Sequence, residues 1–332
     1  HGKPCRRSYC EVTSESCVDR PGGLWITFTS STVVPGLGAI PNEDVVAYDP
    51  FTGTWEWILD GSDLGLASFA IDGLALLSSG DILLSFTAAG NVNGLTGGPS
   101  GTLIDDSDII LFHPTSLGST TTGTFQFYFD GSDVGLVADG EDVDAITLLD
   151  TGELAISTLA PVDAPGATGG HEDVWVFHAE QLGANTVGFF TKLFDGRDVE
   201  LGQSAAENVD AVGLTAWGTL LLSTSGEFAT FGLTGSNEDI FEFTPLSWSF
   251  PTNGFAELSF DLSQLGIEPT EDVAAMEWVE GSLPDELPDV EFVLSSLEGP
   301  VPLEITGQAI TSDGRPLPEG DYTWLIDGEP DA

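Results

Sequence analysis

The sequence predicts an all-β fold built from four repeats, and two recurring acidic landmarks reveal the period. One landmark is an acidic turn that follows a strand-like run and begins at Asp60, Asp130, Asp195 and Asp261. The other is an acidic residue that opens a β-rich run, at Asp44, Asp108, Asp173 and Asp239. Both landmarks recur about every 65 residues, and a fixed period of this size indicates a modular array.

One repeat, taken over residues 141–201, contains four expected strands. Residues 144–149 and 153–158 are β-rich and flank a Gly-bearing turn, which predicts a hairpin. A loop rich in Pro and Gly follows at 161–170, and residues 173–177 and 188–194 give the third and fourth strands. Four antiparallel strands in this length make one blade-sized sheet. The other repeats match this order, and no helical period competes with it.

The two ends of the array predict a closed ring. The first repeat starts at a second strand, residues 24–30, and lacks a first strand. A surplus first strand follows the last complete repeat, at 271–279. Together they complete a fourth sheet, whereas an open solenoid would need polar caps at both ends. The sequence therefore predicts a four-bladed β-propeller closed by its N- and C-terminal strands, without deciding which strand lies innermost.

This organisation gives three segments. We expect a basic, Cys-containing arm at residues 1–21 and the propeller at 22–280, with repeats at about 22–66, 67–137, 138–202 and 203–280. The repeats resemble those of secreted acidic β-propeller repeat proteins. Residues 281–332, with a turn at 312–315 and Tyr322, Thr323 and Trp324 in one run, resemble the opening strands of an immunoglobulin-like sandwich. That resemblance covers about half of the roughly 100 residues of such a domain and implies a partial β segment with open edges.

Composition bounds the partners. The chain has 332 residues, with 54 Asp and Glu against 7 Lys and Arg, and a formal net charge of -47. Its 41% of hydrophobic residues is enough for a core, so the acids coat a folded body. Nucleic acid is excluded as a partner because it needs clustered basic residues, and no apolar run is long enough for a membrane span. Adaptation to high salt is an alternative source of the acidity.

The arm concentrates the positive charge and all the cysteines. Lys3, Arg6, Arg7 and Arg20 lie in the first twenty positions, which leaves three basic residues for the rest of the chain. Cys5, Cys10 and Cys17 are favoured as a disulfide with one thiol left for a neighbouring chain, which fits a secreted or cell-surface protein. With His1 they also offer ligands for zinc or an iron–sulfur cluster, although their spacing matches no paired site.

The recurrent acids are the candidate metal ligands. If their strand lies innermost, Asp44, Asp108, Asp173 and Asp239 converge on the channel as a ring that suits Ca²⁺. The rival ring is formed by Asp72, Asp144 and Asp210, with Ala274 at the fourth position. The alternative for either set is that these residues cap strand entrances through turns.

The predicted function is that of a non-enzymatic extracellular structural protein, since no nucleophile elbow, phosphate-binding loop or dinucleotide motif is present. It would associate with copies of itself, as an oligomer or filament, through Lys3, Arg6, Arg7, the cysteines and the open C-terminal segment. The alternative is a secreted propeller that binds carbohydrate or peptide on its long loops at 88–105, 160–170 and 225–236.

Overall fold

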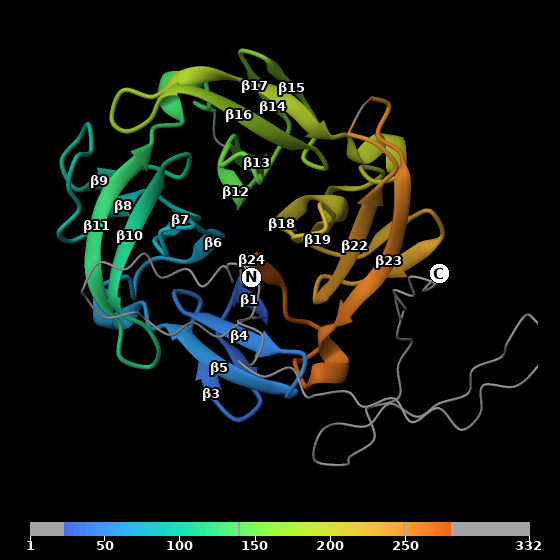
Figure 1. Cartoon of the computed structure of the whole chain (residues 1–332), viewed down its shortest axis with the longest axis horizontal. Coiled ribbons are helices and arrows are strands. Elements are labelled where there is room, and N and C mark those ends of the chain that lie inside the picture. The colour runs from blue at the N-terminus through green and yellow to red at the C-terminus, as the bar shows by residue number, and fades with distance from the viewer. Residues whose placement is uncertain (1–22, 139, 249, 280–332) are drawn as a thin grey trace, which may run out of the picture. The chain divides into compact units, whose positions relative to one another are not determined.

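Four antiparallel sheets of four strands surround a central axis in the computed structural model (Figure 1). The structure describes residues 23–279, with the exception of residues 139 and 249. The arm and the C-terminal segment therefore lie outside the described residues. Each sheet is one blade of a β-propeller, which confirms the predicted fold class.

Each blade places its strands in the same order outward from the axis. Blade one runs from β24 (Val273–Val279) through β1 (Gly23–Phe28) and β4 (Val45–Asp49) to β5 (Thr54–Leu59). Blade two contains β6 (Ile71–Leu76), β7 (Ile82–Phe86), β10 (Ile109–Ser116) and β11 (Thr122–Phe129). Blade three contains β12 (Val143–Leu148), β13 (Leu154–Thr158), β16 (Val174–Gln181) and β17 (Val187–Phe194). Blade four contains β18 (Val209–Leu214), β19 (Leu220–Thr224), β22 (Asp239–Pro245) and β23 (Gly254–Asp261).

The ring is closed as the sequence predicts. Strand β1 pairs with β24 in antiparallel register, from Gly23 opposite Val279 to Phe28 opposite Val273. Residues that lie some 250 positions apart in the chain thus share one sheet, and β1 is paired on both sides, with β24 and with β4. The innermost strands β6, β12, β18 and β24 face one another around the axis (Figure 1).

The core lies between neighbouring blades. Because every blade is covered on both faces, its inner strands are buried on both sides, as in β7, in which all five residues are buried and four are apolar. Aromatic rings join adjacent blades: Phe129 and Phe177 meet edge-on at 5.0 Å, and Phe194 and Phe243 at 5.1 Å. Four apolar clusters of this kind, one for each junction, hold the blades in a ring.

The predicted loop at 161–170 is partly regular. Between the second and third strands of each blade, the chain forms a short two-stranded ribbon. The ribbons are β2 (Thr32–Val34) with β3 (Gly38–Ile40), β8 (Gly90–Asn91) with β9 (Leu103–Ile104), β14 (Val162–Ala164) with β15 (Ala167–Gly169), and β20 (Phe228–Thr230) with β21 (Leu233–Gly235). They have the same place in every repeat, so they are part of the blade.

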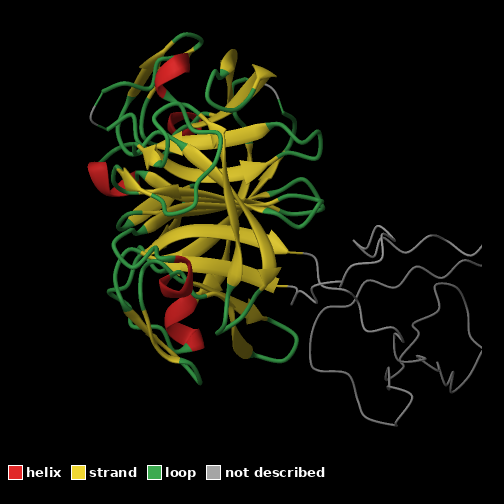
Figure 2. Ribbon diagram, turned by 90° about the vertical axis from the view of Figure 1, so that its left-hand side faces the viewer, coloured by secondary structure: helices red, strands yellow, loops and turns green. Residues whose placement is uncertain are grey.

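The acidic turns connect one blade to the next, and each forms a 3₁₀ turn after the outer strand. These are η1 (Ser62–Leu64), η2 (Ser132–Val134), η3 (Gly196–Val199) and η5 (Leu262–Leu265), while η4 (Ala205–Glu207) precedes β18. Figure 2 shows these turns gathered toward one face of the ring. The third strands also begin at this face, because the first residue of each inner strand donates a backbone hydrogen bond to the residue two positions before the recurrent Asp, as Val209 does to His171 at 3.0 Å.

Candidate functional site

The four recurrent acids at Asp44, Asp108, Asp173 and Asp239 do not form a ring around the channel. They lie at the start of β4, β10, β16 and β22, which are the third strands from the axis. The sequence left open whether this strand was innermost, and the structure gives that place to another strand. Each of these carboxylates therefore acts within its own blade.

Their shared role is to fix the turn at the entrance of the third strand. Asp44 Oδ1 accepts a hydrogen bond from Gly61 N at 2.7 Å, and Asp173 Oδ1 accepts one from Gly196 N at 3.1 Å. Asp239 Oδ2 accepts from Ser236 N at 2.9 Å. This is the capping geometry expected of Asp at a turn. Burial raises the pKa of Asp44 to about 7 and that of Asp108 to about 8.

The rival set does lie on the innermost strands. Asp72, Asp144 and Asp210 are the second residues of β6, β12 and β18, and Ala274 has that place in β24. The structure adds two acids that sequence reasoning missed, Asp142 and Asp272, each directly before its inner strand. The sequence signal lies two positions before the rival set in each repeat, where the four residues are Ala70, Asp142, Asn208 and Asp272.

Five acids on or directly before the innermost strands, which we term the channel acids, have few hydrogen-bond donors and, within the described residues, no basic residue near them: Asp72, Asp142, Asp144, Asp210 and Asp272. Ser85 Oγ donates to Asp72 Oδ1 at 2.7 Å, and Asn208 Nδ2 donates to Asp144 Oδ2 at 2.5 Å. In contrast, Asp72 Oδ2 and both oxygens of Asp210 are buried and receive no hydrogen bond from outside the group. Carboxylates in such a place must hold protons or a cation.

The pKa values of the channel acids follow from this. Burial, with the neighbouring charges of Asp142 and Asp144, holds the pKa of Asp72 well above its usual value. Burial likewise raises the pKa of Asp142 to about 8, of Asp144 to about 7 and of Asp272 to about 6. Each raised pKa means that burial disfavours the charged carboxylate, so the channel acids become protonated as the pH falls through the neutral range.

Blade three differs from this pattern because it contains both basic residues of the described part of the chain. Lys192 Nζ bridges Asp173 Oδ2 at 2.7 Å and Asp195 Oδ2 at 2.8 Å. Burial would lower the pKa of Lys192, but its bonds to the two carboxylates outweigh this and raise it. Arg197 Nε lies 2.6 Å from Glu172 Oε1. Both bases are therefore engaged inside one blade.

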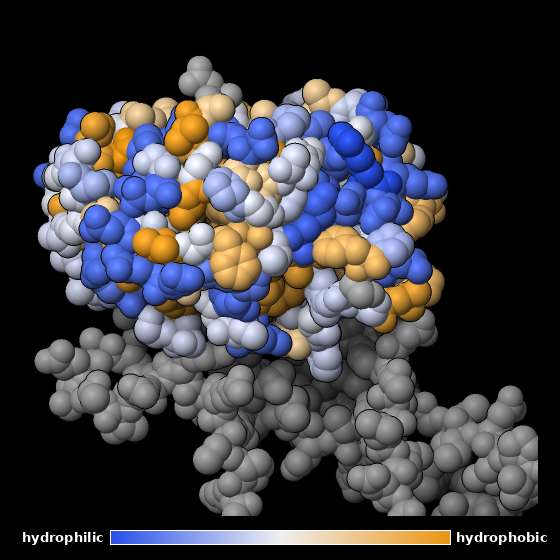
Figure 3. Space-filling model, turned by 90° about the horizontal axis from the view of Figure 1, so that it is seen from above, coloured by the Kyte–Doolittle hydropathy of each residue, from blue (hydrophilic) through white to orange (hydrophobic). Residues whose placement is uncertain are grey.

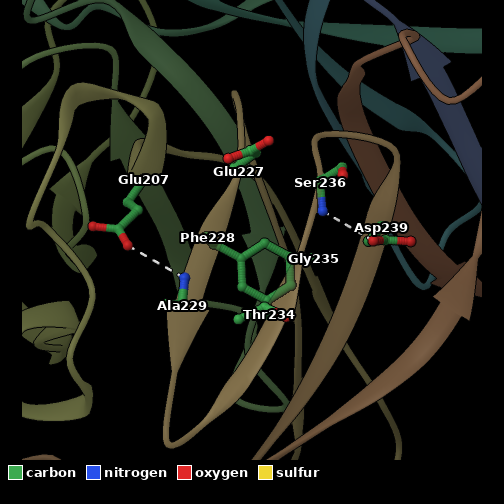
Figure 4. A pocket seen from close by; sticks show the side chains of 8 residues that line it. All are labelled: Glu207, Glu227, Phe228, Ala229, Thr234, Gly235, Ser236 and Asp239. Carbon is green, nitrogen blue, oxygen red and sulfur yellow. Dashed lines mark hydrogen bonds between the residues drawn. The ribbon is translucent and has the colours of Figure 1, made fainter.

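Blade four has the corresponding acids without a base. Glu238, Asp239 and Asp261 each offer one carboxylate oxygen, and these three oxygens lie within 4.8 Å of one another. Asp239 also lines a pocket of about 610 Å³ at the ribbon β20–β21, together with Glu207 and Glu227 (Figure 4). Glu207 Oε1 accepts a hydrogen bond from Ala229 N at 3.2 Å at this pocket. Its acidic lining suits a cationic ligand.

The predicted assembly residues Lys3, Arg6, Arg7, Cys5, Cys10 and Cys17 lie outside the described residues. The same holds for the sandwich-like segment at 281–332. Within the described ranges, no helix is long and apolar enough to cross a membrane.

Comparisons with known proteins leave the family open. No protein-family model and no curated protein matches the chain. Among solved structures, it is similar to the extracellular domain of a putative hybrid two-component system from B. thetaiotaomicron, at 12% identity and a TM-score of 0.27. That alignment covers 71% of this chain and 34% of the other, so this chain spans about a third of that protein's length.

A protein from Lactobacillus plantarum is similar at 11% identity and a TM-score of 0.25, over 90% of this chain and 81% of that one. At TM-scores this low, neither likeness bears on function. The propeller assignment therefore rests on the sheets of this chain alone.

Proposed function

We propose that this protein is a non-enzymatic extracellular structural protein that associates with copies of itself, with the basic arm of one copy bound to the acidic face of another. The observation that supports this is the placement of charge. The exposed acids of the turns between blades, Asp63, Asp133 and Asp198, and the acidic pocket all belong to the face where the inner and third strands begin. Lys192 and Arg197, the two Lys and Arg residues of the propeller, form ion pairs within blade three.

An acidic face without free bases attracts a cationic partner, and the chain carries one of its own. Lys3, Arg6, Arg7 and Arg20 lie within twenty residues of sequence. A contact from the arm of one copy to the face of the next is head-to-tail, so it produces a ring or a filament. Attraction of this kind is weakened by salt, since the Debye length falls from about 10 Å at 0.1 M to about 3 Å at 1 M.

The outer edges of blades three and four offer additional contact area. Phe189 on β17 is 51% exposed and Phe255 on β23 is 65% exposed. Hydrophobic and hydrophilic residues are interspersed on the side of the ring shown in Figure 3. Apolar side chains on the open outer strands are available to a further strand, such as one from the C-terminal segment of a neighbour.

Light scattering of the full chain at low and high salt tests the proposal. We expect higher oligomers at low salt, and their loss in about 1 M NaCl or under reducing conditions if a disulfide joins the copies. Replacing Lys3, Arg6 and Arg7 with Gln should give a monomer. The matched control replaces Glu11 and Glu15 of the same arm with Gln and should keep the oligomer. A monomer at every salt concentration with the arm intact would rule the proposal out.

The second candidate function is a ligand-binding propeller, and the pocket at β20–β21 favours it. This pocket lies in the loop at 225–236 and is lined by Glu207, Glu227 and Asp239. Its acidic lining narrows the ligand to a cationic one, such as a basic peptide. Binding of an oligolysine peptide by the monomer, lost in Glu227→Gln, would support this function over self-association.

A further inference from the structure

Blade four brings three carboxylates close together, and at the equivalent position in blade three an ammonium group lies among the acids. Asp239 and Asp261 are direct cross-strand partners on β22 and β23. Glu238 precedes Asp239, and the nearest oxygens of the three lie within 4.8 Å of one another. Like charges opposite each other on paired strands destabilise a sheet, so this arrangement calls for a positive charge.

The corresponding position in blade three shows what fills such a site. There Glu172, Asp173 and Asp195 have the same places as the blade-four acids, and Lys192 Nζ lies 2.7 Å and 2.8 Å from two of them. Lys192 pairs with Trp175, and Leu258 pairs with the equivalent Phe241 in blade four. Leu258 therefore stands where the ammonium group originates and supplies no charge.

The two other nitrogen-bearing side chains beside Glu172 in blade three are also replaced. Arg197, which lies against Glu172, corresponds to Ser263 in blade four. His171, whose Nδ1 is 3.5 Å from Glu172 Oε2, corresponds to Asn237. Three positions that present nitrogen groups in one blade thus present none with a positive charge in the next.

A single residue difference also removes one backbone donor from the Asp of blade four. Gly196 N donates to Asp173, and a Cβ at Gly196 would stand only 2.4 Å from Glu172 O. Blade four has Leu262 at this position, and a leucine cannot approach the facing strand as closely as glycine does. Asp239 receives no such bond, and its Oδ1 is buried without a hydrogen-bond partner, as is Glu238 Oε2; these side chains are only 9% and 4% exposed.

From these observations we propose that Glu238, Asp239 and Asp261 form a divalent cation site, with Ca²⁺ as the ion that fits best. Ca²⁺ binds oxygen ligands at about 2.3–2.6 Å, so the ligands of one ion lie up to about twice that length apart, as these oxygens do. The donor set is entirely carboxylate, which suits Ca²⁺ or Mg²⁺ better than zinc. The pocket beside Asp239 gives access to water molecules that complete the coordination.

Asp261 is held ready for this role by its own turn. Ser263 Oγ and Gln264 N both donate to Asp261 Oδ1, at 2.5 Å and 3.2 Å. These bonds keep the carboxylate charged and lower its pKa. Burial raises the pKa of Asp239 and Glu238, so cation binding there competes with protons. The site does not depend on assembly, and the arm is not part of it.

Calorimetric titration of the metal-stripped full chain with CaCl₂ tests the site through one designed pair of variants. Leu258→Lys should place an ammonium group among the three carboxylates, as in blade three, and remove one Ca²⁺ site per chain. Leu246→Lys is the matched control, because it adds the same charge at an exposed position of the same blade, beyond the other end of β22. It should bind as many ions as the unmodified protein.

Asp239→Asn provides a second measurement if Leu258→Lys fails to fold, because the amide oxygen of Asn can still accept the bond from Ser236 N. It should weaken Ca²⁺ binding at this site at least tenfold, which is about 1.4 kcal/mol. Equal ion numbers and affinities in the unmodified protein, Leu258→Lys and Asp239→Asn would overturn the proposal. So would an unmodified protein that binds no Ca²⁺.

Discussion

Blades three and four have the same strands and the same acidic positions but balance the acidic charge in different ways. In blade three, Lys192 lies between Asp173 and Asp195, and Arg197 lies against Glu172. In blade four, Leu258 and Ser263 have the places of Lys192 and Arg197 and supply no positive charge. The fold therefore requires the acids for its turns, while the compensating positive charge can come from the chain or from a bound cation.

The channel acids resemble blade four in this respect, which allows the comparison to be tested on the whole molecule. Their carboxylates are buried together, and none of them contacts Lys192 or Arg197. Conditions that neutralise these carboxylates, or place a base near them, should therefore stabilise the protein, because their negative charge has no basic partner among the described residues.

The largest expected effect is on the pH dependence of stability without divalent cations. The folded-state pKa values of Asp144 at about 7 and Asp142 at about 8 lie above the unfolded value near 4. The folded protein thus holds protons that the unfolded chain has lost, so stability falls as the pH rises from about 4 to about 8. We expect thermal unfolding in EDTA to occur at least about 5 °C lower at pH 8 than at pH 5.

Asp142→Asn sharpens this prediction, because Asn is the residue that the next repeat has at the same position, Asn208. The variant should be more stable than the unmodified protein at pH 8 and equal to it at pH 5. Asp150→Asn, which removes an exposed acid in the hairpin turn of the same blade, should change neither value. A protein that becomes more stable from pH 5 to pH 8 would contradict the assignment of uncompensated acids.

The next largest effect is a loss of stability when Lys192 of blade three is replaced by leucine, the residue at the equivalent position of blade four. Lys192→Leu removes the ammonium group from Asp173, a carboxylate that is 2% exposed, and leaves that charge without its partner. Loss of one member of a buried pair costs about 3 kcal/mol of unfolding free energy, to be measured by denaturant titration. Added Ca²⁺ should restore part of the loss. Lys192→Arg keeps the charge and should lose much less; an equal loss would point to packing.

The smallest of these effects concerns the close approach of Gly196 to Glu172. A Cβ at this glycine would lie 2.4 Å from Glu172 O, so Gly196→Ala must move the turn away from the third strand. We expect a loss of about 1–3 kcal/mol by the same denaturant titration. Gly213→Ala is the comparison, since its Cβ would lie 3.4 Å from the nearest atom, in a flexible methionine. Similar losses in both variants would show that the approach at Gly196 does not matter.

Much of the fold could be predicted from the sequence because it depends on local patterns repeated four times. The strand runs at 82–86 and 220–224 match β7 and β19, and the surplus run at 271–279 contains the closing strand β24. The sequence predicts a loop where a ribbon lies, since strands of two or three residues are too short to show a period. It predicts the acidic turns but not that they join one blade to the next, because that distinction is not local.

The site was predicted less well, and the reason is geometric. The candidate ring of Asp44, Asp108, Asp173 and Asp239 was correct as a set of equivalent positions but depended on which strand faces the axis. Which strand faces the axis depends on how the sheets pack against one another, and the hydrophobic period of a single strand carries no information on this packing. Asp142 and Asp272 were missed because the recurrence at their position is incomplete, with Ala70 and Asn208 in the other repeats.

Hydrophobic pattern, turn chemistry and repeat length are properties of neighbouring residues, so the number of blades, their strands and the closure of the ring can be predicted from the sequence. Which carboxylates meet depends on the packing of the sheets. Asp239 and Asp261 lie 22 positions apart, and Asp72 and Asp144 belong to different blades. The free energy of a buried charge depends on distances and donors that exist only once the sheets are packed.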